Sequence, residues 1–247
     1  MFKYRASADI RLSVTLCKGV CLIENDKRVR IICGHYGSGK TEFAVNYAIR
    51  LAKEGGKPVL ADIDIINPYF RSRERTEELE NLGVEVVASA TSATALDVPA
   101  ISAGIHSVFD DTSRDAVVDV GGNEAGVKVL NRFADHFRNS EEYELFFIIN
   151  ANRPETIECS QILEFIRSFE NACGIRVSGL INNTHMLKST TVQDIIAGYK
   201  LSAEVSKAAG IQLRYNAGLE RLGAELPAEI MKTFFPLDLH MREDWMS

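Results

Sequence analysis

The stretch Gly34-His35-Tyr36-Gly37-Ser38-Gly39-Lys40-Thr41 decides how the rest of the chain is interpreted. It matches the pattern G-x-x-x-x-G-K-[ST] without a mismatch, and it lies between an apolar run at residues 29–33 and a stretch with helical spacing at residues 40–54. Glycines let backbone N–H groups turn inward to form a concave anion site, and the following helix directs its positive dipole end there. The stretch therefore predicts a phosphate-binding loop.

Two side chains of this loop suit a nucleoside triphosphate and its magnesium ion. Lys40 is placed to reach the β- and γ-phosphates as a point charge. The Thr41 hydroxyl suits Mg²⁺, a hard cation that prefers oxygen ligands. We therefore expect residues 34–41 to bind a nucleotide together with Mg²⁺.

Strand-like apolar runs alternate with helical stretches from Arg28 onward. The predicted strands span residues 29–33, 59–63, 84–89, 116–120, 145–150, 177–181 and 211–215. The predicted helices span residues 40–54, 71–82, 98–109, 126–137, 154–173 and 191–209. This alternation is typical of an α/β fold of three layers, in which helices cover both faces of a mostly parallel sheet of about seven strands.

The length of 247 residues suits one domain, at residues 28–247, after an N-terminal extension at residues 1–27. The extension mixes charges with short apolar pieces, so it is either a β-hairpin added to the sheet edge or a poorly ordered segment, and the second is favoured. Near the other end, residues 219–226 have a helical pattern. The apolar residues 234–237 are expected to pack on the domain rather than on a partner.

Composition narrows the class of protein. The formal net charge of -6 argues against a general affinity for nucleic acid. The longest apolar runs, such as residues 145–149, are far too short to span a bilayer. Five cysteines without a pairing pattern indicate a reducing compartment. We expect a cytoplasmic protein that binds neither nucleic acid nor a membrane.

Acidic residues follow two of the predicted strands. Asp119 ends one apolar run, and an acid at the carboxyl end of a parallel strand can hold Mg²⁺ through water. Gly122, three residues later, is placed to sense a γ-phosphate through its N–H group. Asp62 and Asp64 lie two residues apart, so their side chains point to the same side. We expect one of this pair to hold metal-bound water and the other to orient the attacking water, and the spacing leaves open which does which.

With these motifs in this order, the sequence resembles the MinD/ParA-like P-loop ATPases, which include the nitrogenase iron protein, the arsenite-pump ATPase and the cobyrinate amidase-type proteins. The resemblance covers about residues 28–215 by the matched strands and motifs. It is carried by residues 34–41, Asp62-x-Asp64, Asp119-Val120-Gly121-Gly122 and Gly179-Leu180-Ile181-Asn182-Asn183.

The resemblance implies a role for each matching residue. Lys40 and Thr41 match the phosphate lysine and the magnesium hydroxyl, Asp119 the Walker-B acid, Asp64 the acid that positions water and Asp62 the acid before it. Asn183 matches the asparagine that contacts adenine, with Asn182 as the fallback, and an asparagine offers both a donor and an acceptor to an adenine edge. Because no Asn-Lys-x-Asp guanine motif follows the sixth strand, ATP is preferred over GTP.

The sequence departs from the family pattern at His35. Many members carry a second lysine there, which reaches across a dimer interface to the partner's nucleotide. A neutral imidazole supplies less positive charge than lysine. A homodimer could instead take charge from Arg71 or Arg73, which follow the aspartate pair and are as readily explained as surface residues.

These observations favour a Mg-ATP-binding protein that hydrolyses ATP slowly and acts as a nucleotide-dependent switch. The resemblance also allows an ATP-dependent ligase or kinase of the dethiobiotin-synthetase kind, a metal-centre or iron–sulfur assembly ATPase, or a nucleotide-binding interaction module without catalysis. The chain contains no C-x-x-C pair of the kind an assembly ATPase would place at a dimer axis. The expected partners are the nucleotide and either a second copy of the chain or an unknown protein.

Overall fold

The computed structural model describes residues 23, 25–64, 76–88, 103–138 and 141–241. One sheet holds every strand of this part of the chain, and all neighbouring strands are parallel. The strands are β1 (Val29–Gly34), β2 (Pro58–Asp62), β3 (Glu85–Ala88), β4 (Asp115–Asp119), β5 (Tyr143–Ile149), β6 (Gly179–Asn182), β7 (Gln212–Leu219) and β8 (Phe234–Leu237). Their order across the sheet is β3-β2-β4-β1-β5-β6-β7-β8.

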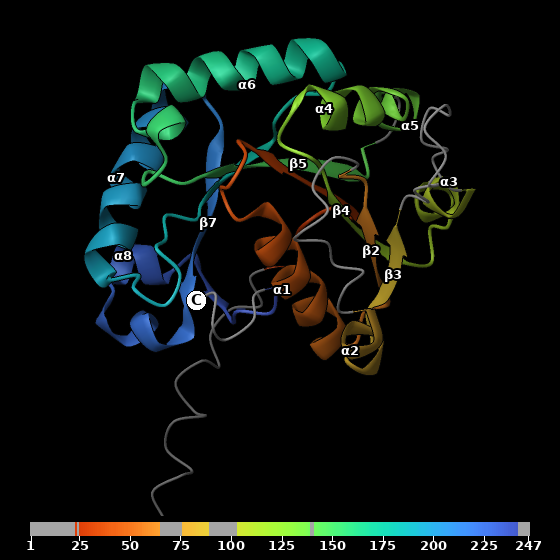
Figure 1. Cartoon of the computed structure of the whole chain (residues 1–247), viewed down its shortest axis with the longest axis horizontal. Helices are drawn as coiled ribbons and strands as arrows, with labels where there is room; N and C mark the ends of the chain where they lie inside the picture. The colour runs from red at the N-terminus through yellow and green to blue at the C-terminus, as the bar shows by residue number, and fades with distance from the viewer. Residues whose placement is uncertain (1–22, 24, 65–75, 89–102, 139–140, 242–247) are drawn as a thin grey trace, which may run out of the picture.

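Helices cover both faces of the sheet, as Figure 1 shows with α4 and α6 on one side and α1 on the other. The helices are α1 (Lys40–Lys53), α2 (Thr76–Asn81), α3 (Ala103–Asp110), α4 (Glu124–Asn131), α5 (Ala134–Arg138), α6 (Cys159–Cys173), α7 (Val192–Ala209) and α8 (Ala228–Met231), with 3₁₀ turns η2 (Pro154–Thr156) and η3 (Glu220–Glu225). The predicted three-layer α/β class is confirmed, with eight strands among the described residues where about seven were expected.

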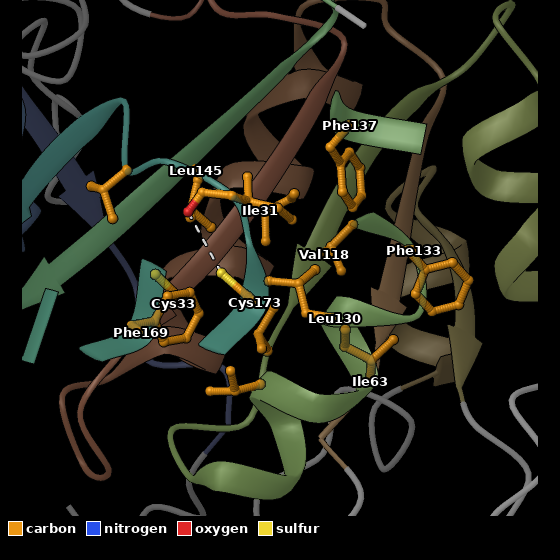
Figure 2. Packing of buried hydrophobic residues seen from close by; sticks show 14 of the residues in the cluster. Ile31, Cys33, Ile63, Val118, Leu130, Phe133, Phe137, Leu145, Phe169 and Cys173 are labelled. Carbon is orange, nitrogen blue, oxygen red and sulfur yellow. Dashed lines mark hydrogen bonds between the residues drawn. The ribbon is translucent and has the colours of Figure 1, made fainter. Parts of the chain in front are cut away.

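Alternate residues of each strand divide between two apolar cores, because successive side chains of a strand point to opposite faces. In β1, Ile31 and Cys33 belong to the core under α3 to α7, whereas Ile32 belongs to the core under α1. Figure 2 shows the first of these cores, where strand residues meet helix residues, among them Ile31, Val118, Leu145, Leu130, Phe133, Phe169 and Cys173. The two cores pack the central strands between the helix layers.

Some element boundaries differ from the sequence prediction. The predicted helix at residues 126–137 is two helices, α4 and α5. The helix predicted at 154–173 is instead the turn η2 followed by a separate helix, α6. The N-terminus of α6 is stabilised by a capping box that Glu158 and Gln161 form. The helical pattern at 219–226 is the 3₁₀ turn η3. Residues 71–75 and 98–102, where two predicted helices begin, lie outside the described residues.

The apolar residues 234–237 form a strand, β8, that the sequence pattern did not predict. They pair with β7 from Asn216↔Phe234 to Leu219↔Leu237, so they pack on the domain as expected. The same pairing explains why β7 continues to Leu219, four residues beyond its predicted end. Asn216, Ala217 and Gly218 lack strand propensity, and the neighbouring strand supplies the backbone partners that hold them extended.

Part of the predicted N-terminal extension packs into the domain. Ile23 and Asp26 are buried. The Asp26 carboxylate accepts hydrogen bonds from the Tyr47 hydroxyl at 2.5 Å, from the Tyr215 hydroxyl and from the Arg214 guanidinium. Residues 1–22 and 24 lie outside the described residues, so the choice between a hairpin and a poorly ordered segment stays a prediction. Among the described helices, none combines the length and the apolar character needed to cross a bilayer.

The sheet order brings the sequence motifs to one edge. Strand β1 lies between β4 and β5, and β2 lies beside β4, so the carboxyl ends of these strands meet at the loop that starts at Gly34. Asp62 and Asp119 are directly paired across β2 and β4, and Ile32 pairs with Asp119 across β1 and β4. Ligands of open parallel sheets bind beyond the carboxyl ends of the strands, at the point where connections from neighbouring strands lead to opposite sides of the sheet.

Candidate functional site

The loop of residues 34–41 curls around the start of α1. Gly37 and Gly39 have φ angles of 73° and 85°, in the left-handed region that glycine adopts without a Cβ penalty. Gly39 occupies the N-cap position, so the first N–H groups of α1 open toward the inside of the loop. This backbone is suited to cradling phosphate oxygens.

Lys40 lies inside the loop rather than in solvent. Its ammonium group donates to the His35 carbonyl at 3.1 Å, and the side chain is buried. Burial lowers the pKa of Lys40 below its usual value, while the carboxylates of Asp119 and Asp64 oppose that shift. A buried ammonium facing two carboxylates and an anion cradle is well placed to bind a polyphosphate.

Thr41, Asp119 and Asp62 form the part of the site that fits Mg²⁺. The Thr41 hydroxyl donates to Asp119 Oδ2 at 2.6 Å, and the other oxygen of Asp119, Oδ1, is buried without a hydrogen-bond partner. Burial, then the neighbouring Asp62 carboxylate, raises the pKa of Asp119 to about 7, against the opposing effects of Thr41 and Lys40. Hydroxyl and carboxylate oxygens are the donors Mg²⁺ prefers, so this donor set fits the ion.

The structure separates the two aspartates that the spacing left open. Asp62 is 2% exposed and directly paired with Asp119 in the sheet, and its Oδ1 accepts the Asp64 N–H at 3.0 Å. Asp64 is half-buried, lines the pocket described below, and places Oδ1 within 2.9 Å of where a Cβ on Gly121 would lie. Asp62 therefore lies beside Asp119, in the oxygen set that fits Mg²⁺, whereas Asp64 lines the pocket.

Gly122 approaches the phosphate loop so closely that only a hydrogen atom fits there. A Cβ at this position would lie 2.7 Å from Lys40 Nζ, 2.7 Å from the Gly34 carbonyl oxygen and 2.8 Å from the Tyr36 nitrogen. The next residue, Asn123, caps α4 by accepting the Gly126 N–H at 3.0 Å. The loop after β4 is thus packed between the phosphate loop and the start of α4.

The two adjacent asparagines have different environments. Asn182 is fully buried and donates to the Ile195 carbonyl and to Asn216 Oδ1, both at 3.0 Å, which ties β6 to α7 and β7. Asn183 lines the pocket, and its Nδ2 donates to the Ser38 carbonyl at 2.9 Å. Its Oδ1 is buried without a hydrogen-bond partner. Of the two, Asn183 is the one placed to meet a ligand.

A cavity of about 330 Å³ opens over these residues. It is lined by Tyr36, Gly37, Gly39, Lys40, Thr41, Glu42, Asp64, Arg153, Asn183, His185, Leu187, Thr190, Gly218, Leu219, Leu237, Leu239 and Met241. The lining combines the phosphate loop and charged side chains with the aliphatic side chains Leu187, Leu219, Leu237, Leu239 and Met241. This combination suits a ligand with a charged part and a flat apolar part, as a nucleotide has.

Several lining residues had no signal in the sequence. Arg153 precedes turn η2, donates from Nε to the Gly37 carbonyl at 2.9 Å, and lies 3.2 Å from the Cβ position of Gly37. An arginine before a proline carries no motif of its own. The residues Leu237, Leu239 and Met241 are about 200 positions from the phosphate loop in sequence. Only the fold could place them here.

His35 turns toward α6. Its ring packs edge-on against Phe165, with 5.3 Å between ring centroids, and its Nδ1 lies 3.9 Å from Glu155 Oε2. The residue at the position of the family's second lysine thus contacts its own domain. Arg71 and Arg73, the alternative cations considered from the sequence, lie outside the described residues.

An all-parallel sheet with this loop between β1 and α1 is the fold of the P-loop nucleoside triphosphatases. Comparison with solved structures agrees. The chain resembles FtsY from the chloroplast of Physcomitrella patens (TM-score 0.52, 20% identity, 77% of this chain and 58% of that one). It also resembles FtsY from Mycoplasma mycoides (0.51, 20%, 77% and 59%) and the signal recognition particle receptor FtsY from Elizabethkingia anophelis (0.50, 18%, 76% and 56%).

These similarities establish the fold alone. The chain spans less than two thirds of the length of each of the three FtsY structures. A scan against protein-family models finds no match, and neither does a search of curated proteins. Membership of the narrower MinD/ParA-like group therefore stays a prediction.

Proposed function

We propose that this protein binds Mg-ATP and hydrolyses it slowly, as a nucleotide-dependent switch. The observation that carries the proposal is that Lys40, Thr41 and Asp64 line one cavity, while Asp119 contacts Thr41 and Gly122 packs against Lys40. A chance phosphate-type loop would not bring a buried ammonium, an orphaned carboxylate oxygen and a closely packed glycine to the same few ångströms. Each supports a different part of triphosphate chemistry.

In this proposal the loop N–H groups and Lys40 hold the β- and γ-phosphates. Thr41, Asp119 and Asp62 would hold Mg²⁺, which when bound neutralises charge on the phosphate oxygens. Asp64, which faces the cavity beside Gly121, orients the attacking water. Gly122 keeps the loop after β4 against Lys40, so that this loop and α4 respond to the γ-phosphate.

The orientation of Asn183 supports ATP over GTP. Its Nδ2 donates to the Ser38 carbonyl at 2.9 Å and lies 3.5 Å from the Gly39 carbonyl, whereas its buried Oδ1 has no hydrogen-bond partner, so Oδ1 is the amide atom left to bind a ligand. An acceptor suits the N6 amino group of adenine. The O6 atom of guanine is itself an acceptor, and would leave the buried Oδ1 unpaired at a cost. In this proposal Asn183 acts as a hydrogen-bond acceptor, which is one of the two roles that the sequence left open for it.

The test is phosphate release from ATP with Mg²⁺ by the wild type, Lys40→Ala and Asp64→Ala. We expect slow release by the wild type and a loss of at least tenfold in both variants, which is the scale of about 1.4 kcal/mol in the barrier. Lys40→Ala should also lose binding, whereas Asp64→Ala should keep it. Equal release by all three proteins would contradict the proposal, and tight binding without release would point to a non-catalytic nucleotide module.

The switch would act on a protein partner, and we propose a second copy of this chain. Exposed apolar side chains stand on the loops around the site: Tyr36 is 61% exposed, Met186 56% and Ile157 53%. A contiguous patch of exposed apolar side chains marks a protein contact, and the proposal is that these three belong to one. Light scattering with ADP and with a non-hydrolysable ATP analogue tests this, and we expect the doubled mass only with the analogue. One mass in both states would contradict it.

A further inference from the structure

The C-terminal part of the described chain is fastened to the helix that follows the phosphate loop. We name residues 237–241 the C-terminal strap. Asn46 of α1 donates to the Asp238 carbonyl and accepts the Asp238 N–H, both at 2.8 Å. One helical turn earlier, the Glu42 carboxylate accepts the N–H groups of His240 at 2.5 Å and of Met241 at 3.2 Å. Four hydrogen bonds therefore hold the strap backbone in place.

The strap presents alternate side chains to the nucleotide cavity. Leu237, Leu239 and Met241 line it, while the intervening residues Asp238 and His240 do not. This is the two-residue alternation of an extended chain. Leu237 and Met241 are 7% and 8% exposed, so both are packed into the domain.

The strap supplies three of the five aliphatic and methionine side chains that line the cavity. Leu187, which follows β6, and Leu219, at the end of β7, line the same cavity and add to the apolar surface of the strap residues. Asn183, with its unpartnered acceptor Oδ1, also lines this cavity. A purine base has two apolar faces and a polar edge, which matches aliphatic walls beside a single hydrogen-bond acceptor.

We propose that the C-terminal strap is the base-binding wall of the nucleotide site, with Leu239 and Met241 packing against the face of an adenine base. The inference rests on the proposed function, because it assigns a base to the same cavity. It makes the strap residues determinants of affinity for the nucleoside half of the ligand and not for the triphosphate half. It also makes Asn46, which lies outside the cavity lining, a positioning residue that acts by holding Asp238.

The experiment compares two ligands by titration calorimetry with Mg²⁺, on the full chain: ATP, and tripolyphosphate, which has no base. The variants are Leu239→Ala, Met241→Ala and Asn46→Ala. Met231→Ala is the matched control, because Met231 is 40% exposed on α8 and does not line the cavity. We expect each strap variant to bind ATP about tenfold more weakly, which corresponds to about 1.4 kcal/mol. Tripolyphosphate affinity should stay within twofold of the wild type.

The outcomes separate the two proposals. Alanine variants at Leu239, Met241 and Asn46 that bind ATP as tightly as the wild type overturn the base wall and leave the proposed function standing. Variants that lose ATP and tripolyphosphate equally also overturn it, because the strap would then support the fold and not the base. A wild type that binds neither ligand overturns the proposed function itself. Leu239→Met, which keeps the apolar side chain, should restore ATP affinity, and thermal unfolding without ligand identifies any variant that has lost its fold.

Discussion

Replacing Gly122 by alanine tests how the loop after β4 is coupled to the phosphate loop. The new Cβ would lie 2.7 Å from Lys40 Nζ and from the Gly34 carbonyl, where ordinary contact begins at 3.4 Å, so these atoms must separate by about 0.7 Å. Two of its three close neighbours are backbone atoms of the phosphate loop, which cannot move alone. Overpacking of this kind costs about 1–3 kcal/mol. We expect kcat/KM for ATP to fall by about tenfold to a hundredfold.

The assay is steady-state phosphate release, with thermal unfolding of the same samples. Gly210→Ala is the control: its φ of +70° is strained for alanine, but no atom lies within 4 Å of the new Cβ, and it ends α7. We expect both variants to lose about 1 kcal/mol or more of stability, and only Gly122→Ala to lose kcat/KM. Unchanged kinetics in Gly122→Ala, or an equal kinetic loss in both variants, would refute the coupling.

Further predictions concern charge and base selectivity. Because the pKa of Asp119 is raised to about 7, with Asp62, Asp64 and Lys40 around it, the folded apo protein binds this proton more tightly than the unfolded chain. The stability that this tighter proton binding gives is present below about pH 4 and is lost as the pH rises through 7. Because Mg²⁺ needs the ionised carboxylate, the affinity for Mg-ATP should rise between pH 6 and 8 in calorimetric titrations. An affinity that does not change with pH would count against this. Arg153→Ala should raise KM for ATP about tenfold, with Arg153→Lys in between, because a flexible ammonium cannot reproduce the guanidinium contact with Gly37. Wild type should bind ATP more tightly than GTP in competition titrations, and Asn183→Ala should remove most of that preference.

Local patterns were sufficient to predict seven of the eight described strands and to bring the phosphate loop and the aspartates to one edge of the sheet. The phosphate loop, Asp62, Asp64 and Asp119 lie at strand ends, and parallel strands bring their carboxyl ends to one edge, so order along the chain gives proximity in space. The same geometry predicted Gly122 beside the loop, and the structure places it there. What the patterns left open was orientation. Whether Asp62 or Asp64 faces the cavity depends on the packing around β2 and not on spacing.

The apolar half of the site could not be predicted, because its contacts are long-range and carry no motif. Glu42 and Asn46 bind backbone groups more than 190 residues away, and any sequence at residues 238–241 could offer those N–H groups. Strand β8 is short and contains a proline, so its sequence does not match the pattern typical of a strand. Residues 234–237 were recognised as packing on the domain, but their position beside β7, which leads the strap to the cavity, follows only from the fold.

The most direct test of the central claim is binding of Mg-ATP to the wild type and to Lys40→Ala, measured by calorimetry with and without Mg²⁺. Lys40 is the buried ammonium of the loop, donating to the His35 carbonyl. We predict that the wild type binds ATP, that binding weakens when Mg²⁺ is removed, and that Lys40→Ala loses at least tenfold in affinity. No binding by the folded wild type, or equal binding by both proteins, would contradict the account.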